Sequence, residues 1–330
     1  MVSLYPLVQN EMIKMLKKRR FLVVVLILAI LIPMFTYAQM KVAENYRKQF
    51  GTEDWRVTTQ QQIIDYTNRL NSNRVAEEWK KILRVEVQRL QYALEQNVNP
   101  QWPSGVTFMR DFVQNSVSLF IPLLIAVMAS DIISSEHSTG TIKLLLTRPV
   151  QRWKILMSKW VTLILFVGLI LLSTAILSYL ISGAVFGYSG WNMPVLIGYQ
   201  LIGDELSTAN VHAIPQWQFI LMEIGLAWFS GVIVATLSLM VSVLVRSTAA
   251  SMGIMLATLI AGTILTNMVS TWESAKYLFM VNLETINYLT GSIPPVPGMT
   301  LTFSLATLAV WGLAALIIAF TVFTRKDIMN

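Results

Sequence analysis

The chain has 330 residues, of which 55% are hydrophobic and only 13% are charged, and it contains no cysteine. A soluble protein carries about 25% charged residues, so this composition excludes a pair of ordinary soluble domains and indicates partial cover by lipid. The absence of cysteine excludes disulfides, thiolate metal sites and a cysteine nucleophile. The net charge of +7 would suit nucleic acid only if the basic residues formed a binding surface.

Several apolar stretches are long enough to cross a bilayer, because a spanning helix needs about 20 apolar residues. They predict an all-α integral membrane protein with transmembrane helices at residues 21–38, 112–133, 160–186, 217–245, 249–269 and 300–323. Pro33 and Pro122 lie inside the first two stretches and are expected to kink them. The first stretch has the general pattern of a signal peptide, but its apolar run is long for a signal core, so we expect it to be retained.

Basic residues concentrate in the loops on one side of these predicted helices. They lie at residues 14–20, 143–159, 246 and 325–326, whereas the short opposite loops hold only Lys276. The positive-inside rule therefore predicts that both termini are cytoplasmic, with an N-terminal interfacial helix at 1–20 and a tail at 324–330. The orientation of the chain in the membrane then accounts for the excess of basic residues, and we expect no nucleic acid to bind.

The segments predicted on the outer side differ in polarity. Residues 39–111 are polar with apolar residues at helical spacing, which predicts an extracellular helical hairpin with a turn at residues 71–73. The hairpin could cap an exit path or bind a ligand, or it could be a stalk or a dimer contact. The loops at 187–216 and 270–299 are apolar and aromatic but too short to span, which predicts short interfacial or re-entrant helices.

Residues that could carry out catalysis are scarce. There are two histidines, His137 and His212, without matching ligands for zinc, and no glycine-rich loop that could hold a nucleotide phosphate. We therefore expect neither an enzyme nor a cofactor bound by this chain. Glu223 lies about two turns inside the fourth predicted span, where an ionisable group suggests a substrate path. The alternative is a shallow carboxylate that reaches the membrane interface.

Small residues at four-residue spacing predict close helix contacts. They occur as Gly183 and Gly187 in and just after the third predicted span, and as Gly253, Ala257 and Ala261 in the fifth. We expect both groups to pack within the chain rather than in a dimer interface.

The cytoplasmic loop at 134–159 carries the most distinctive pattern. A turn at Gly140 precedes an apolar run that ends at a proline, and the characteristic residues are Glu136, Gly140, Thr141, Leu144, Leu145, Leu146, Pro149 and Arg152. This pattern, together with six spans and cytoplasmic termini, resembles the ABC-2 type transporter permeases. The long outer segment is similar to that of the subgroup with an extended extracellular domain.

The resemblance implies a permease subunit of an ATP-driven exporter in the cell membrane of a bacterium. Its partners would be two copies of a cytoplasmic ABC ATPase subunit, which bind ATP and Mg²⁺, and a second permease subunit in a homodimer or heterodimer. The residues implied to couple to the ATPase are Glu136, Gly140, Thr141, Leu145, Pro149 and Arg152. The alternative function is a membrane sensor or assembly protein that binds an extracellular ligand through residues 39–111.

Overall fold

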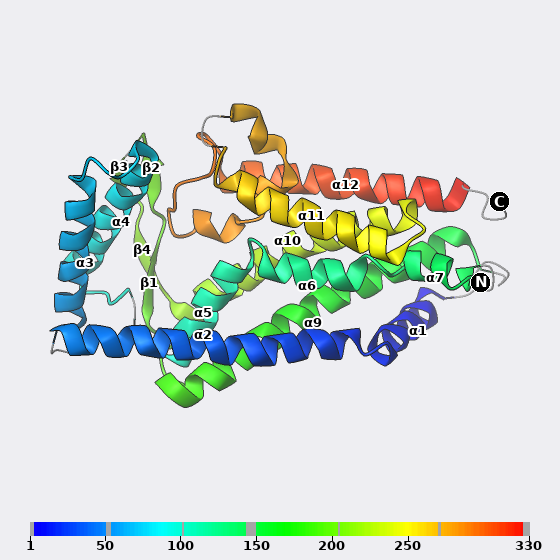
Figure 1. Cartoon of the computed structure of the whole chain (residues 1–330), viewed down its shortest axis with the longest axis horizontal. Helices are drawn as coiled ribbons and strands as arrows, with labels where there is room; N and C mark the ends of the chain where they lie inside the picture. The colour runs from blue at the N-terminus through cyan, green and yellow to red at the C-terminus, as the bar shows by residue number, and fades with distance from the viewer. Residues whose placement is uncertain are drawn as a thin grey trace.

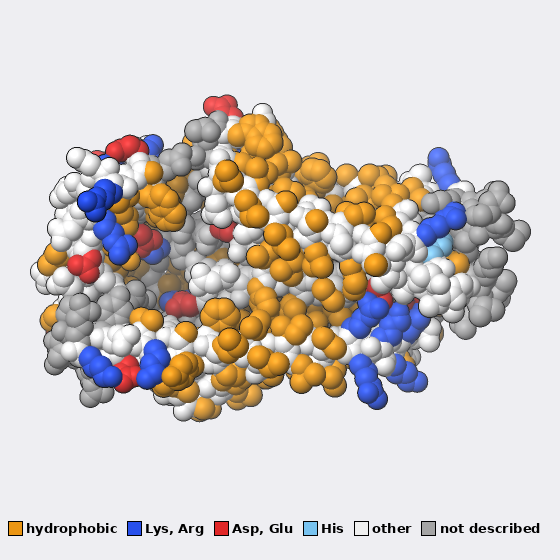
Figure 2. All heavy atoms as spheres, viewed as in Figure 1, with side chains coloured by type: hydrophobic (Ala, Val, Ile, Leu, Met, Phe, Trp, Pro, Cys, Tyr) orange, Lys and Arg blue, Asp and Glu red, His pale blue; other side chains and the backbone are white. Residues whose placement is uncertain are grey.

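The computed structural model describes residues 3–50, 54–100, 102–142, 150–203, 205–269 and 272–325. Six of its helices are long and apolar enough to cross a membrane, and the chain is a multi-pass membrane protein that is mostly helical. Hydrophobic side chains cover the middle of the molecule, and charged side chains gather at its two ends (Figure 2). Both termini lie at one of these ends, which we call the terminal end (Figure 1).

The N-terminal helix α1 (Leu4–Lys17) is followed by a turn in which Arg19 has a φ of +56°. Helix α2 then runs from Arg20 to Phe50. The helix continues past the predicted boundary at residue 38, because polar residues 39–50 keep the helical conformation. It also passes through Pro33 without ending there.

The predicted helical hairpin is present as α3 (Trp55–Leu70) and α4 (Glu77–Glu95), at the end opposite the termini (Figure 1). The side chain of Asp54 accepts a hydrogen bond from the Arg56 amide and caps α3. Helix α4 ends four residues before Asn99, because Asn97 adopts a φ of +55° and the Val98 amide donates to the Ala93 carbonyl at 2.9 Å. This is the Schellman arrangement that commonly ends helices.

The second predicted span, 112–133, is wrong as a single helix. The structure divides this region into α5 (Gly105–Ser116), α6 (Phe120–Ala129) and the short α7 (Ser134–Ser138). Pro122 cannot donate a hydrogen bond to the residue four positions earlier, so the chain breaks before α6 rather than bending within a longer helix. Only α6 and the residues after it are apolar enough to span.

The remaining spans are α9 (Arg152–Phe186), α10 (Gln216–Leu244), α11 (Thr248–Thr266) and α12 (Leu301–Arg325). The last three agree with the predicted spans within a few residues. Helix α9 begins eight residues earlier than predicted, so residues 152–159 belong to the span and not to the loop at 134–159. Helices α6, α9 and α10 lie at the centre of the bundle, and α2, α11 and α12 lie at its periphery.

The predicted short helix in the loop at 187–216 is also wrong. The loop is an antiparallel ribbon in which β1 (Pro194–Ile197) pairs with β4 (His212–Pro215), and β2 (Gln200–Ile202) pairs with β3 (Glu205–Ser207). Gly198 and Gly203 adopt positive φ at the ends of the strands, which suits a turning ribbon better than a helix. The structure at 273–288 consists of short 3₁₀ helices η1 (Glu273–Tyr277), η2 (Phe279–Asn282) and η3 (Thr285–Tyr288).

The prediction that the small residues pack within the chain is confirmed for Gly183 and wrong for the small residues of α11. Gly183 packs inside the chain, where α5 meets the end of α9, and the Gly105 amide donates to the Gly187 carbonyl at 2.8 Å. In α11, by contrast, Gly253 and Ala257 face outward, and a side chain at Gly253 would meet nothing within 4 Å.

The contact between Gly105 and Gly183 should be sensitive to a single methyl group. A Cβ at Gly105 would lie 2.7 Å from the Gly183 Cα, so Gly105→Ala should force the two backbones apart and cost about 1–3 kcal/mol. The matched control is Gly225→Ala in α10, where a Cβ meets nothing within 4 Å and alanine is the better helix former. In detergent, the thermal unfolding midpoint should fall for Gly105→Ala and not for Gly225→Ala. Equal midpoints for the two variants would contradict this packing.

Candidate functional site

The terminal end of the bundle contains a buried cluster of charged side chains from elements distant in sequence. At its centre is Lys159 of α9, whose side chain has 0% exposure. Its ammonium group donates to Glu11 of α1 at 2.7 Å, to Glu136 of α7 at 2.9 Å and to the Ile132 carbonyl at 3.4 Å. All three donors of the ammonium are therefore used, which offsets the cost of removing the charge from water.

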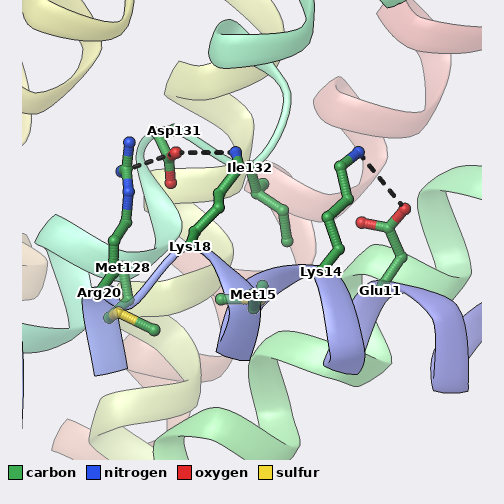
Figure 3. A pocket seen from close by; sticks show the side chains of 8 residues that line it. All are labelled: Glu11, Lys14, Met15, Lys18, Arg20, Met128, Asp131 and Ile132. Atoms are coloured by element: carbon green, nitrogen blue, oxygen red, sulfur yellow. Dashed lines mark hydrogen bonds and ion pairs between the residues drawn. The ribbon is translucent and has the colours of Figure 1, made fainter. Parts of the chain in front are cut away.

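Helix α1, the turn after it and the start of α2 add further cations to this cluster (Figure 3). Lys14 contacts both Glu136 and Glu11, and Lys18 and Arg20 approach Asp131 at 3.3 Å and 2.6 Å. The contact of Arg20 brings opposite charges together without the alignment of a hydrogen bond. Burial lowers the pKa of Lys14, but the hydrogen bond to Glu136 and the nearby carboxylates outweigh it, so its pKa is raised and it stays charged at neutral pH.

The turn between α6 and α7 is fixed from the other side as well. We call residues 130–138 the elbow. The Ser242 hydroxyl of α10 accepts hydrogen bonds from the amides of Ile133 and Ser134, both at 3.0 Å. The Ser251 hydroxyl of α11 donates to the Ser130 carbonyl at 2.8 Å. The elbow is thus held by α1, α9, α10 and α11 together, which makes it a well-positioned element.

Glu136, predicted as a contact to a partner, has a different place. It is 2% exposed, and its Oε1 accepts from Lys14 and Lys159. The prediction of a direct docking contact is therefore corrected, because the carboxylate points into the chain and is needed to balance buried ammonium groups. Its second oxygen, Oε2, is buried without a hydrogen-bond partner among the described residues.

Of the other predicted coupling residues, Gly140, Thr141 and Arg152 lie at or near the surface beyond the elbow. Gly140 is exposed and has a φ of +71°, so the turn predicted there is present and its backbone is in the left-handed region. Thr141 is exposed and its hydroxyl lies 3.0 Å from that of Thr139. Arg152 begins α9 and donates to the Thr324 carbonyl of α12 at 3.3 Å. Leu145 and Pro149 lie outside the described residues.

The opposite end of the molecule contains a cavity of about 240 Å³, which we call the hairpin cavity. Helices α3 and α4 form one wall, strand β1 forms another, and α5 and α10 meet below. Its charged and aromatic lining residues are Tyr66, Glu86, Arg89, Trp102, Arg110, Asp111, Tyr199 and Phe219. Burial raises the pKa of Tyr199 to about 12, so its hydroxyl remains neutral.

Glu223 lies one helical turn after Phe219, and it has 0% exposure. Its carboxylate is enclosed by the chain, so it neither reaches the molecular surface nor lines the hairpin cavity. Neither oxygen makes a well-formed hydrogen bond. The groups that act on it are Arg110, Asp111 and the backbone of Gln114, all from α5.

Sequence reasoning missed the central residue of the terminal cluster. Lys159 was counted only among the cations that set orientation, and Glu11 was not singled out. A signal was present for Glu11, which lies four residues from both Leu7 and Met15 on the apolar face of α1. An acidic residue on such a face needs a buried cation.

The chain belongs to the family described as "Protein of unknown function (DUF2705)", which it matches over residues 79–329. It is 26% identical over 335 residues to the "Uncharacterized protein YhcI" of Bacillus subtilis, covering 98% of this chain and 99% of that protein. It is also 26% identical over 215 residues to the "Uncharacterized membrane protein YdbK" of the same species, covering 64% and 80% of the two chains. The second name agrees with the membrane character of the fold.

Removal of the Lys159 charge should destabilise the terminal end. Lys159→Met leaves Glu11 without its closest cation, and the loss of one partner from a buried ion pair typically costs about 3–5 kcal/mol. The double variant Glu11→Gln with Lys159→Met should recover part of this loss, since Glu136 still contacts Lys14. Both are measured as thermal unfolding midpoints.

The control for this comparison is Lys80→Met, which removes the cation from the pair with Glu77, a carboxylate whose side chain is 81% exposed. Exposed pairs contribute little to stability, so its midpoint should stay near that of the native chain. If Lys159→Met behaves like Lys80→Met, the buried cluster does not stabilise the fold.

Proposed function

We propose that this member of the family is the permease subunit of an ATP-driven exporter of the ABC-2 type, in the cell membrane. The chain supplies the membrane path, and a separate cytoplasmic ATPase binds ATP and Mg²⁺. Two ATPase copies and a second permease subunit complete the transporter. The observation that carries this proposal is the elbow, a turn held by buried charges and hydrogen bonds at the end where the termini lie.

The orientation of the chain is part of this proposal. Basic side chains gather at the terminal end (Figure 2), where Lys14, Lys18 and Arg20 belong to the ion cluster. The positive-inside rule favours a cytoplasmic location for such an end, and the hairpin of α3 and α4 is then extracellular. The elbow and the exposed Gly140 would therefore face a cytoplasmic ATPase.

The buried charges support a transmitting role for the elbow. A displacement of the exposed turn at Gly140 and Thr141 would be transmitted to α1 and α9. The reason is that Glu136 contacts Lys14 of α1 and accepts a hydrogen bond from Lys159 of α9. In this proposal Glu136 positions the docking turn instead of touching the ATPase. ATP binding and hydrolysis would bias the spans between two states through this element.

The hairpin cavity favours a second candidate function. A cavity at the far end of the molecule suits a membrane sensor or assembly protein that binds an extracellular ligand.

The two functions differ in their need for an ATPase. Affinity purification of the native chain from its own host should recover an ATPase without membrane spans if it is a transporter subunit, and its absence would favour the sensor.

The proposed orientation can be tested with single cysteines, since the native chain has none. Asn68 of α3 and Ser138 of α7 are both exposed. In intact cells a membrane-impermeant maleimide should label Asn68→Cys and not Ser138→Cys. After permeabilisation both should react, which controls for accessibility. The reverse pattern would contradict the orientation and the docking of a cytoplasmic ATPase.

The exposed turn provides a test of ATPase docking. Gly140 has a φ of +71°, and an added Cβ would meet no atom of the described residues within 4 Å, so Gly140→Val costs about 1–3 kcal/mol of backbone strain and should distort the turn. Gly140→Asn is the matched control, because asparagine tolerates this conformation. The valine variant should insert in the membrane but recover at least about tenfold less ATPase, equivalent to about 1.4 kcal/mol of contact energy. Equal recovery with both variants would show that the turn is not the docking site.

A further inference from the structure

The connection between α1 and α2 carries a run of basic side chains at the surface. We call residues 17–20 the basic turn. Lys17, Lys18 and Arg19 are all exposed. Lys18 contacts Asp131 at 3.3 Å, but Lys17 and Arg19 make no ion pair among the described residues. Two cations therefore face outward at the terminal end without a counter-charge from the described part of the chain.

The buried ion cluster behind the basic turn cannot supply that counter-charge. Each of its three carboxylates already contacts two cations, and Figure 3 shows Lys18 and Arg20 converging on Asp131. The turn and the cluster together hold six cations and three carboxylates, which leaves an excess of three positive charges. The cations are Lys14, Lys17, Lys18, Arg19, Arg20 and Lys159, and the carboxylates are Glu11, Asp131 and Glu136.

The backbone of the basic turn does not itself call for an arginine. Arg19 has a φ of +56°, in the left-handed region that glycine adopts freely and that costs free energy for a residue with a Cβ. Glycine would therefore form this turn more easily. What arginine adds at this position is its exposed guanidinium group.

Exposed apolar side chains lie on both sides of the basic turn. Ile13 and Leu16 are exposed on the face of α1 opposite the buried Glu11, and Leu22 and Leu26 are exposed on the first turns of α2. In Figure 2 the basic side chains of the terminal end adjoin the hydrophobic side chains that cover the middle of the molecule. Cations at the edge of such an apolar surface lie at the level of the lipid headgroups.

We propose that the basic turn binds the phosphate of an anionic phospholipid, whose acyl chains run along the exposed apolar side chains of α1 and α2. The excess of positive charge selects a negative headgroup over a zwitterionic one. The adjoining apolar surface selects a lipid over nucleic acid or an acidic peptide, since neither of these has acyl chains. The inference needs the membrane location of the chain and no ATPase partner.

The size of the effect follows from the electrostatics of basic clusters next to spanning helices. Each Lys or Arg near an anionic membrane surface strengthens binding by about 1 kcal/mol, equivalent to about fivefold in affinity. Lys17 and Arg19 make no ion pair in the described part of the chain, so their full charge is available to the headgroup. Together they should contribute about 25-fold.

The test counts the lipids that remain bound to the purified chain in detergent, by native mass spectrometry. Dioleoylphosphatidylglycerol is the anionic probe. Dioleoylphosphatidylcholine is the control, because it has the same acyl chains and a zwitterionic headgroup. The native chain should bind the anionic lipid at least about fivefold more tightly. Millimolar inorganic phosphate should not displace it, since free phosphate cannot use the apolar surface.

Variants of the basic turn separate lipid binding from a role in the fold. Arg19→Gly removes the guanidinium and suits the backbone, so phosphatidylglycerol should bind about fivefold more weakly while the thermal unfolding midpoint does not fall. Arg19→Lys keeps the charge and should bind like the native chain. Lys17→Gln alone should also weaken binding about fivefold, and its combination with Arg19→Gly about 25-fold.

The matched control removes two cations from the opposite end of the molecule. Arg69 and Arg74 are exposed and make no ion pair among the described residues. Arg69→Gln with Arg74→Gln therefore changes the net charge as much as the double variant of the basic turn, and lipid binding should stay at the native level.

Several results would overturn the proposal. They are equal affinity for the two lipids, native binding in the double variant of the basic turn, and an equal loss in the control at Arg69 and Arg74. Displacement of the lipid by inorganic phosphate or by oligoglutamate would identify a soluble anion as the ligand and overturn it as well. Because no ATPase is present in this assay, failure here leaves the proposed transport function to its own tests.

Discussion

The buried ammonium group of Lys159 sets the main constraint on this structure. A charge with 0% exposure would cost several kcal/mol without partners, so Glu11 and Glu136 must be brought to it. These residues lie 148 and 23 positions away in the chain. Helix α1, the elbow and the start of α9 are therefore fixed relative to one another by a single side chain. Apolar packing alone would allow α1 to shift along the bundle, because the hydrophobic effect has no preferred direction.

This constraint gives the two ends of the bundle different physical characters. At the terminal end, Lys14, Lys18 and Lys159 form ion pairs between the helices. At the other end, the hairpin and the ribbon leave a cavity above α5 and α10. Helix α9 connects the two, running from the ion cluster to its backbone contact with α5 near Gly183. The two ends of α9 therefore have different surroundings, with ion pairs at its start and a close backbone contact with α5 at its end.

Sequence patterns predicted the parts of this structure that depend on local physics. Apolar runs predicted six membrane-spanning segments, although the second is not one unbroken helix, and Gly140 predicted a turn. Parts that depend on distant partners were not predictable in this way. In the sequence, Lys159 looks like an ordinary loop cation, and its burial becomes evident only when α1 packs on α9. The apolar residues of the loop at 187–216 would also suit a short helix, and only the pairing of β1 with β4 makes them a ribbon. The hairpin cavity is likewise created by segments distant in sequence that meet only in the fold.

The central claim is that α1 and the elbow form one body held by Lys159, and hydrogen–deuterium exchange tests it most directly. In the native chain, amides of α1 should exchange as slowly as those at the start of α9. In Lys159→Met, exchange should accelerate in α1 and α7 together, while the hairpin of α3 and α4 keeps its native rate. Fast exchange of α1 in the native chain, or unchanged rates in the variant, would contradict the claim.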